Sequence, residues 1–524
     1  MLSRMSGLLR DVVIGALFGA STGADAFFVA FRIPNLFRRM VAEGAASTAF
    51  VPVFTRYLTK EGRAGAVRAV GAVGGIAVLV LAVLTILGMV FADEVVAVFA
   101  PGFFVDASLR ALTVSLTRAL FPYLLLVGLA AWAMGTLHTF GSFTAPALGP
   151  VLLNLSIVSV ALLFVPGFEP AVFALVVGVL LGGFLQFAVQ VPGLRRQGLR
   201  LGSMFDPGHA AVAGVGRLLL PAILGGAVYQ INILVATIFA SLLPARSVSY
   251  LWYADRVFEF PLGIVAVAVG TAALPSLSRQ ARLPGREGMA ESIAFGLKLV
   301  WALCLPAMVG LWLLAPQVVS VLFERGRFTA VDSASTALAL RAYTVGLLAV
   351  GSARVLASVF YALEKPRFPV GAACLALFAN VVFDLAFMGP TDPNADWWGA
   401  AAVAGIGEAL RVTDLRHAGL ALGTALAAVV NVTVLALMVV RLVPGLAGQR
   451  WARSLGIHLA ASVLMAATVW GLLVIVGSAV GSYLEVALSV TVGTATYLGA
   501  ALLFGSEELR VLFARRTAGP GGTN

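Results

Sequence analysis

The residues best suited to chemistry are charged side chains that interrupt long apolar stretches. One group lies near the N-terminus: Arg4, Arg10, Asp11, Asp25, Arg32, Arg38, Arg39 and Glu43. A second group lies in another apolar stretch: Asp255, Arg256 and Glu259. A charge inside a membrane is costly, so such residues usually face a cavity and mark function.

Several arginines in a low-dielectric cavity favour a phosphate ligand. The guanidinium group offers a planar fork of donors that matches phosphate oxygens and stays charged. Asp25, Arg32 and Arg39 are spaced seven residues apart, so they share a helix face if the helix continues through Pro34. We expect this face to join the other arginines in a cationic cavity that binds a pyrophosphate.

The acidic neighbours of the arginines have two interpretations. Four acids are concerned: Asp11, Asp25, Asp255 and Glu259. They hold the arginines in place and partly neutralise them while the cavity is empty, or they form buried pairs that only lock helices together. The arginines outnumber what pairing requires, which favours a binding role for Arg10, Arg38 and Arg256.

The segments that carry these residues indicate an integral membrane protein. Of the 524 residues, 60% are hydrophobic and 11% are charged, against about 25% charged in a soluble domain. Apolar runs of about 20 residues, enough to cross roughly 30 Å of hydrocarbon, recur along the chain. We predict an all-α membrane protein with about fourteen transmembrane helices, at residues 2–20, 26–55, 68–98, 108–138, 147–165, 170–192, 214–243, 248–277, 293–323, 332–362, 368–388, 417–443, 452–478 and 482–504.

Charge in the loops predicts the topology. The net charge of +11 is concentrated in alternate loops, which is typical of a membrane protein and not of a nucleic-acid-binding surface. Basic loops follow the second, sixth, eighth, tenth and twelfth spans, and acidic loops alternate with them. This pattern predicts an even number of spans with both termini in the cytoplasm.

No other chemistry is indicated by the sequence. Cys304 and Cys374 lie in apolar runs, where they act as small apolar fillers. The chain contains no P-loop, nucleophile elbow or metal box. We therefore expect a protein that is not an enzyme and binds no nucleic acid.

The chain also shows signs of an internal duplication. Equivalent features recur at offsets of 255 − 25 = 230, 341 − 118 = 223 and 380 − 154 = 226 residues. Such repeats usually place a substrate site near the midplane between the halves. We predict a six-helix lobe at 1–192, a second at 193–443 with an outside loop at 389–416, two further helices at 444–504, and a basic cytoplasmic tail at 505–524.

Four segments are similar to one known family. DAFFVAFRIPNLFRRMVAEGAASTAFVPVF (25–54), SRMSGLLRD (3–11), YADRVFEFPLG (253–263) and GTAALPSLS (270–278) resemble the MurJ (MviN) family of lipid II flippases. The resemblance implies the fold of the multidrug/oligosaccharidyl-lipid/polysaccharide exporter superfamily: two six-helix lobes in a V, then two extra helices. In the family, the extra helices flank a groove thought to accept the lipid tail.

The resemblance also implies roles for individual residues. The family's cavity residues fall on Arg4, Arg10, Asp25, Arg38 and Arg256, with Arg32 where lysine also occurs and Glu43 on a family glutamate. Some relatives bind a sodium ion, whose ligands would map to Asn380, Asp384 and Thr424. Relatives often carry aspartate where this chain has Ala236, a departure that argues against sodium coupling.

The implied function is transport of lipid II, an undecaprenyl-pyrophosphate-linked disaccharide pentapeptide, between the leaflets of a bacterial inner membrane. The partners would be lipid II, membrane lipids and the peptidoglycan synthesis machinery, with alternating access as the mechanism. A flippase for another polyprenyl-linked glycan, such as an O-antigen unit, would use the same arginines. A drug or cation antiporter of the superfamily would need an acidic cavity, and a membrane scaffold would not need the intramembrane charges.

Overall fold

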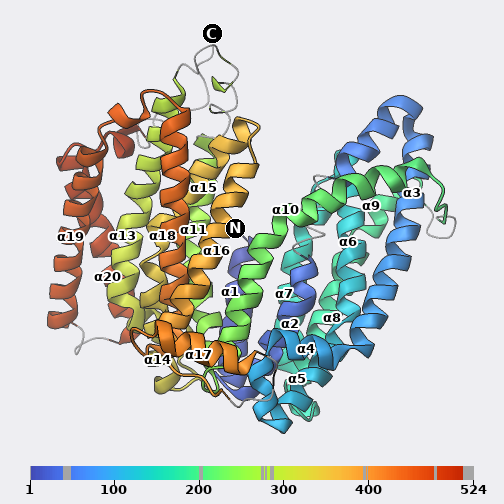
Figure 1. The fold of residues 1–524 in the computed structure, drawn as a ribbon, viewed down its shortest axis with the longest axis horizontal. Coiled ribbons are helices and arrows are strands. Elements are labelled where there is room, and N and C mark those ends of the chain that lie inside the picture. Colours follow the sequence, from blue (N-terminus) through green and yellow to red (C-terminus); the bar gives the residue numbers. More distant parts are fainter. Residues whose placement is uncertain are drawn as a thin grey trace. The chain divides into compact units, whose positions relative to one another are not determined.

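The computed structural model describes residues 2–38, 49–199, 205–272, 277, 280–281, 283, 288–393, 397, 399–476 and 481–511. Their regular structure is helical, and one isolated antiparallel bridge joins Met388 to Asp414. The chain forms two compact units, which are described separately (Figure 1). The first comprises Met1–Ser249, Arg325–Phe328 and Thr391–Ala404, and the second comprises Tyr250–Glu324, Thr329–Pro390 and Gly405–Asn524.

The first unit is built from ten α-helices and two short 3-10 helices within its described part. These are α1 (Leu2–Phe18), α2 (Thr22–Arg38), α3 (Val51–Val90), α4 (Ala92–Phe99), η2 (Pro101–Val105), α5 (Ala107–Leu120), α6 (Pro122–Thr139), α7 (Thr144–Phe164), η3 (Val165–Gly167), α8 (Phe173–Ala188), α9 (Val191–Arg196) and α10 (Ala210–Ser241). Helix α1 packs on α7, α2 on α5, α3 on α6 and α7 on α8.

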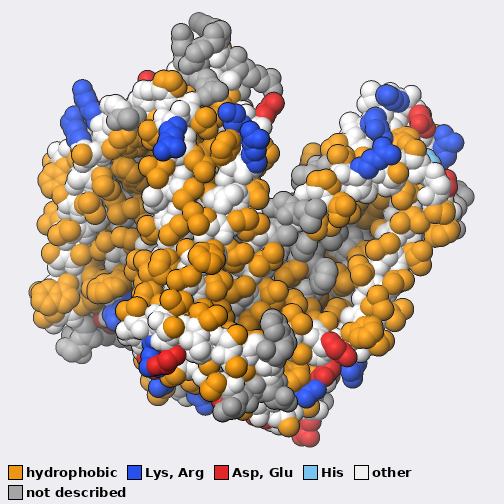
Figure 2. Space-filling model, in the orientation of Figure 1, with side chains coloured by type: hydrophobic (Ala, Val, Ile, Leu, Met, Phe, Trp, Pro, Cys, Tyr) orange, Lys and Arg blue, Asp and Glu red, His pale blue; other side chains and the backbone are white. Residues whose placement is uncertain are grey.

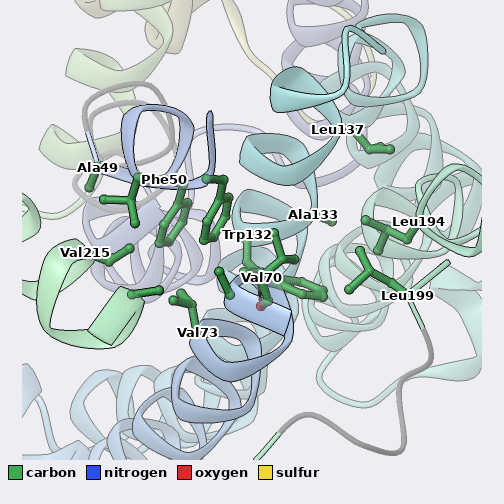
Figure 3. Close-up of a cluster of buried hydrophobic side chains, with 14 residues drawn as sticks. Ala49, Phe50, Val70, Val73, Trp132, Ala133, Leu137, Leu194, Leu199 and Val215 are labelled. Carbon is green, nitrogen blue, oxygen red and sulfur yellow. Dashed lines mark hydrogen bonds between the residues drawn. The ribbon is translucent and has the colours of Figure 1, made fainter. Parts of the chain in front are cut away.

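One core of the first unit lies where α3, α6 and α10 meet (Figure 3). Phe50, Val70 and Val73 belong to this core together with the buried Trp132, whose Nε1–H donates to the Val70 carbonyl oxygen at 3.1 Å. Gly74 is required here, because a Cβ at this position would lie 2.6 Å from the Trp132 ring. This close approach seats α6 against α3.

The second unit contains α13 (Met289–Phe323), α14 (Ala330–Thr344), α15 (Leu347–Ala362), α16 (Arg367–Phe387), α18 (Arg416–Leu442), η5 (Leu446–Gly448), α19 (Trp451–Val476) and α20 (Ser482–Leu503). Two helices cross the division: α11 (Ser247–Ala272) and α17 (Ala400–Leu410). Helices α16 and α18 pack together, and α19 and α20 pack on each other and on α13. The hydroxyl of Tyr497 on α20 donates to the Ala302 carbonyl oxygen of α13 at 2.6 Å. This hydrogen bond joins α20 to α13.

Many helices have the length and composition of membrane spans. Among the described residues nine qualify, and the bent pair α14–α15, with an angle of 43°, makes a tenth. Figure 2 shows hydrophobic side chains over the visible flanks of each unit, with charged side chains mainly near helix ends. A helix satisfies its own backbone hydrogen bonds, so such apolar flanks are suited to hydrocarbon.

The other four predicted spans also fall on helices. Helices α1 and α2 are each 17 residues long, with α2 followed by residues outside the description. The predicted spans 214–243 and 248–277 coincide with α10 and α11. The remaining ten correspond to α3, α5 with α6, α7, α8, α13, α14 with α15, α16, α18, α19 and α20.

The expected outside loop at 389–416 contains the short helix α17, which is compatible with that prediction. Two segments differ from the sequence-based expectation. Helix α3 begins at Val51, with a non-helical Gly62 (φ +70°), so basic residues expected in a loop before residue 68 are helical. The expected tail from 505 begins with packed residues, because Glu508 and Leu509 are buried.

The predicted lobes at 1–192 and 193–443 follow the sequence repeat, whereas the two compact units follow contacts between helices. Helix α10 belongs to the first unit because it packs against α3, α4 and η2. Helices α19 and α20 belong to the second unit because they pack on α13. The lobe boundaries therefore stay a prediction about the repeat.

Candidate substrate-binding site

Arg10 of α1 is held by side chains from three helices. It lies on the buried face of α1, and its Nε and Nη2 donate to both carboxylate oxygens of Asp11 at 2.8–3.0 Å. Its Nη1 donates to Asn154 Oδ1 on α7 at 3.1 Å. The guanidinium carbon lies 6.0 Å from the centroid of the Phe31 ring on α2. Three helices therefore fix one cation.

Asn154 is the residue that the sequence-based site prediction missed. It appeared there only as a marker of the internal repeat. In the structure its Nδ2 donates to Ser6 Oγ at 3.0 Å and to the Ser3 carbonyl oxygen at 3.3 Å, while its Oδ1 accepts from Arg10. A buried asparagine in an otherwise apolar helix is the sequence signal that points to such a partner.

The other arginines of α1 and α2 have varied surroundings. Arg4 is exposed near the start of α1. Arg32 is partly buried, and its Nη1 donates to Thr237 Oγ1 of α10 at 2.7 Å. Arg38, at the end of α2, donates its Nε–H to Asn35 Oδ1 at 2.6 Å. Two further predicted site residues, Arg39 and Glu43, lie outside the described residues.

Asp25 contacts main chain as well as a side chain. Its carboxylate accepts from the backbone N–H of Arg246 at 2.6 Å and of Ser249 at 2.8 Å, and from the Ser249 hydroxyl. Ser249 lies in the first turn of α11, where backbone N–H groups lack intrahelical acceptors. Asp25 therefore ties the first turn of α2 to the beginning of α11, within the first unit.

Arg256 is the arginine of the second unit, on α11. Its Nη2 lies 3.1 Å from Asp255 Oδ2 and its Nη1 lies 2.9 Å from Glu259 Oε2. The guanidinium carbon lies 4.9 Å from the ring centroid of Trp252, one turn earlier on the same helix. The side chain keeps 21% of its surface exposed. The predicted convergence of Arg256 with the arginines of α1 and α2 stays a prediction.

The three residues predicted to bind sodium lie on α16 and α18. Asn380 Nδ2 donates to Asp384 Oδ1 at 3.0 Å, and both residues are fully buried. Asp384 packs against Gly423, where a Cβ would lie 2.2 Å from Oδ1. Thr424, the next residue, donates its hydroxyl to its own helix at Leu420. Within the described part of the chain, Asp384 Oδ2 has no hydrogen-bond partner.

An apolar groove runs between α13, α19 and α20 in the second unit. Its volume is about 330 Å³. Its walls are formed by small and aliphatic side chains, among them Pro306, Gly310, Met465, Val469 and Gly493. A groove lined in this way suits a hydrocarbon chain.

Comparison with known sequences identifies the family. Residues 14–395 match the family described as lipid II flippase MurJ. This chain belongs to the MurJ family. It is 36% identical over 395 residues to a probable lipid II flippase MurJ of Vibrio cholerae, covering 74% of this chain and 75% of that protein. It is 35% identical over 391 residues to the lipid II flippase MurJ of Burkholderia cenocepacia, covering 73% of this chain and 76% of that protein.

Comparison with solved structures confirms the fold. A lipid II flippase MurJ in an inward closed conformation matches with a TM-score of 0.78 at 24% identity, covering 98% of both chains. An inward-facing multidrug resistance transporter of the MATE family and MOP superfamily matches with a TM-score of 0.69 at 14% identity, covering 86% of this chain and 96% of that one. The predicted all-helical, multi-pass membrane fold and the expected transporter class are thus confirmed.

Proposed function

We propose that this chain translocates lipid II from the inner to the outer leaflet of a bacterial inner membrane for cell-wall synthesis. The observation that carries the proposal is the charge of α1 and α2 in a member of this family. The two helices contain four arginines and two aspartates, 4 − 2 = +2, within otherwise apolar sequence. Arginine suits the pyrophosphate that links the headgroup to its lipid.

Arg10 is the best-placed ligand for that pyrophosphate. Asp11 and Asn154 hold its guanidinium in one orientation, so little rotational freedom remains to be lost when an anion binds. Asp11 balances the charge of Arg10 in the empty site, which makes the buried cation tolerable. Alternating access would then expose the bound headgroup first to one side of the membrane and then to the other.

The apolar groove of the second unit supports a place for the polyprenyl tail. Lipid II carries a long hydrocarbon chain that must stay in an apolar environment while the headgroup crosses. The walls contributed by α13, α19 and α20 offer that environment. We therefore assign the headgroup to the arginines and the tail to this groove.

Energy for transport can come from the membrane potential. Outward movement of an anion is favoured by an inside-negative potential, at about 2.3 kcal/mol per charge per 100 mV. The residues Asn380 and Asp384 offer oxygen ligands that fit a cation, since Asp384 Oδ2 has no other partner among the described residues. The membrane potential and a bound cation can be separated by measuring flipping in vesicles at imposed potentials, with either sodium or potassium present. Flipping that persists at zero potential in the presence of sodium but vanishes without sodium would show that the cation is required despite Ala236.

The proposed topology has both termini in the cytoplasm. Cysteines introduced at positions 62 and 449 should then react only from the cytoplasmic side, and a cysteine at position 169 only from outside. Outside labelling at position 62 would overturn this orientation.

Depletion of the protein tests the substrate itself. Lipid II should accumulate in the cytoplasmic leaflet when the protein is removed, and cell-wall synthesis should stop. Accumulation of a different polyprenyl-linked glycan would favour the alternative flippase. We further propose that the peptidoglycan synthesis machinery is the partner of this chain, since it consumes the product.

A further inference from the structure

Two arginines outside the candidate site occupy equivalent places in the two units. Arg118 on α5 donates its Nε–H to the carbonyl oxygen of Met89 at 3.1 Å. Arg341 on α14 donates its Nε–H to the carbonyl oxygen of Trp312, also at 3.1 Å. In both pairs the arginine follows its acceptor by 29 residues. The pairs therefore repeat one local structure.

Each acceptor is a carbonyl that its own helix leaves unsatisfied. Met89 lies in the last turn of α3, where carbonyls have no N–H four residues later in the helix. Trp312 lies four residues before Pro316 of α13, and proline has no N–H to donate. An unsatisfied carbonyl in hydrocarbon is costly, so the Nε–H of each arginine replaces a missing bond. This role needs one donor and no charge.

The Nη1 and Nη2 groups of both arginines are not used by the hydrogen bond to the carbonyl. Neither arginine makes a further hydrogen bond or an ion pair with the described residues. Exposed apolar residues lie beside both acceptors: Val90 and Phe91 follow Met89 in the chain, and Trp312 keeps 51% of its surface exposed. A guanidinium on a lipid-facing surface requires an anion or the polar edge of the membrane.

We propose that Arg118 and Arg341 are phosphate-binding sites on the lipid-facing surfaces of the two units, each taking the phosphate of an anionic lipid headgroup. In each case the Nε–H donates to a carbonyl, and the N–H groups of Nη1 and Nη2 can donate to the phosphate. This inference concerns lipid association and does not depend on which lipid is transported.

The surroundings of Arg118 have room for a headgroup. A hollow of about 430 Å³ lies beside it, lined by Asp93, Arg110 and Ser115 among others. Asp93 binds Arg110 at 2.6 Å, and this hydrogen bond holds the pKa of Asp93 below its usual value. Asp93 therefore stays ionised, binds Arg110 and also attracts Arg118, so one carboxylate faces two arginines and a net charge of 2 − 1 = +1 remains for the ligand.

The feature beside Arg341 is an aromatic ring rather than a hollow. The guanidinium carbon lies 5.4 Å from the ring centroid of Trp312, in a cation–π arrangement that keeps the flat group against the helix surface. Tryptophan is one of the side chains enriched at lipid headgroup level. Both sites thus pair one arginine with a local feature that suits a headgroup.

Substitution by glutamine separates the two roles of each arginine. The Nε2 of glutamine stands at the same number of bonds from Cα as the Nε of arginine, so Arg118→Gln and Arg341→Gln keep the donor to the carbonyl and remove only the charged fork. Native mass spectrometry of the full-length protein with added phosphatidylglycerol should show about one bound lipid fewer for each variant and about two fewer for the double variant.

Matched controls keep the result interpretable. Arg411→Gln, which breaks an exposed ion pair with Glu408 on α17, should leave lipid binding unchanged. Arg118→Lys and Arg341→Lys keep the charge and should retain most of the bound lipid. Melting temperatures should stay near that of the parent for the glutamine variants. Unchanged lipid counts in the folded double glutamine variant would overturn the proposal.

A second experiment distinguishes a bulk membrane lipid from the transported lipid as the source of the phosphate. The same variants are compared with a polyprenyl pyrophosphate in place of phosphatidylglycerol, and flipping is measured in vesicles of neutral lipid. Loss of phosphatidylglycerol alone, with flipping intact, identifies bulk lipid as the ligand. Loss of the pyrophosphate lipid together with slower flipping identifies the transported lipid. Equal binding of both lipids by parent and variants refutes either source.

Discussion

Arg10 and Arg256 show two ways in which a helix can carry a cation through an apolar environment. Arg10 is buried and is held by Asp11, by Asn154 from another helix and by the Phe31 ring. Arg256 is partly exposed, and Asp255, Glu259 and Trp252 of its own helix contact its guanidinium group. The first arrangement buries the cation among three helices, whereas the second leaves part of the guanidinium side chain exposed.

The largest effect is expected from removing Arg10. Arg10→Ala should abolish growth in a complementation assay, but it also leaves Asp11 as a buried unpaired charge, which costs about 3–5 kcal/mol. The double variant Arg10→Ala/Asp11→Asn removes that charge as well. It should restore membrane expression without restoring flipping, measured as lipid II accessible from outside. Recovery of flipping in the double variant would show that the pair only locks helices.

A similarly severe loss of transport is expected at Arg256, with little loss of stability. Arg256→Ala should abolish flipping, while the melting temperature falls only slightly because the partly exposed pairs contribute about 0–1 kcal/mol each. Arg256→Lys keeps the charge without the fork and should restore flipping only in part. The comparison fails if Arg256→Ala lowers the melting temperature as much as Arg10→Ala does.

A smaller effect is expected at the residue that orients Arg10. Asn154→Ala removes one acceptor for Arg10 and two donated hydrogen bonds to the start of α1. A loss of about 1.4 kcal/mol in positioning corresponds to about tenfold slower flipping. Initial flipping rates in vesicles provide the measurement. Asn35→Ala serves as the matched variant, because it removes an asparagine acceptor from Arg38 in the same way. A rate equal to the parent would show that Asp11 alone orients Arg10.

The smallest effect on transport is expected at a buried charge far along the chain. Burial would raise the pKa of Glu508, but His458 with its Nε2 at 3.5 Å and the hydroxyls of Ser506 and Ser454 lower it to about 2. The stabilisation is therefore present above the ordinary pKa of about 4.5 and is lost as the pH falls toward 2.

Glu508→Gln should lower the melting temperature by several degrees at pH 7 and leave the flipping rate of the folded protein unchanged. The difference in melting temperature between parent and variant should shrink as the pH is lowered below about 4.5. A variant with normal stability and slow flipping would place Glu508 in the transport machinery, and would remove the distinction between structural and functional charges.

Much of the fold could be predicted from local sequence. Apolar runs near 20 residues located the helices, because a membrane span is defined by its own length and composition. Helix ends were harder to place. Gly62 interrupts α3, and the polar segment before residue 68 is helical although it is not apolar, so hydropathy alone missed it. Residues 505–511 looked like a tail by composition, but burial of Glu508 and Leu509 packs them against the protein.

The sequence by itself determined which residues are charged within apolar helices, and from these residues it predicted a membrane transporter with a cationic site. Only the tertiary structure decided the partners. Asn154 lies 144 residues from Arg10, and Arg246 and Ser249 lie 221 and 224 residues from Asp25. A buried polar group must find a hydrogen-bond partner, but its identity depends on which helices pack together. The same holds for the carbonyl of Trp312: Pro316 shows in the sequence that it is orphaned, and the packing of α14 on α13 supplies Arg341.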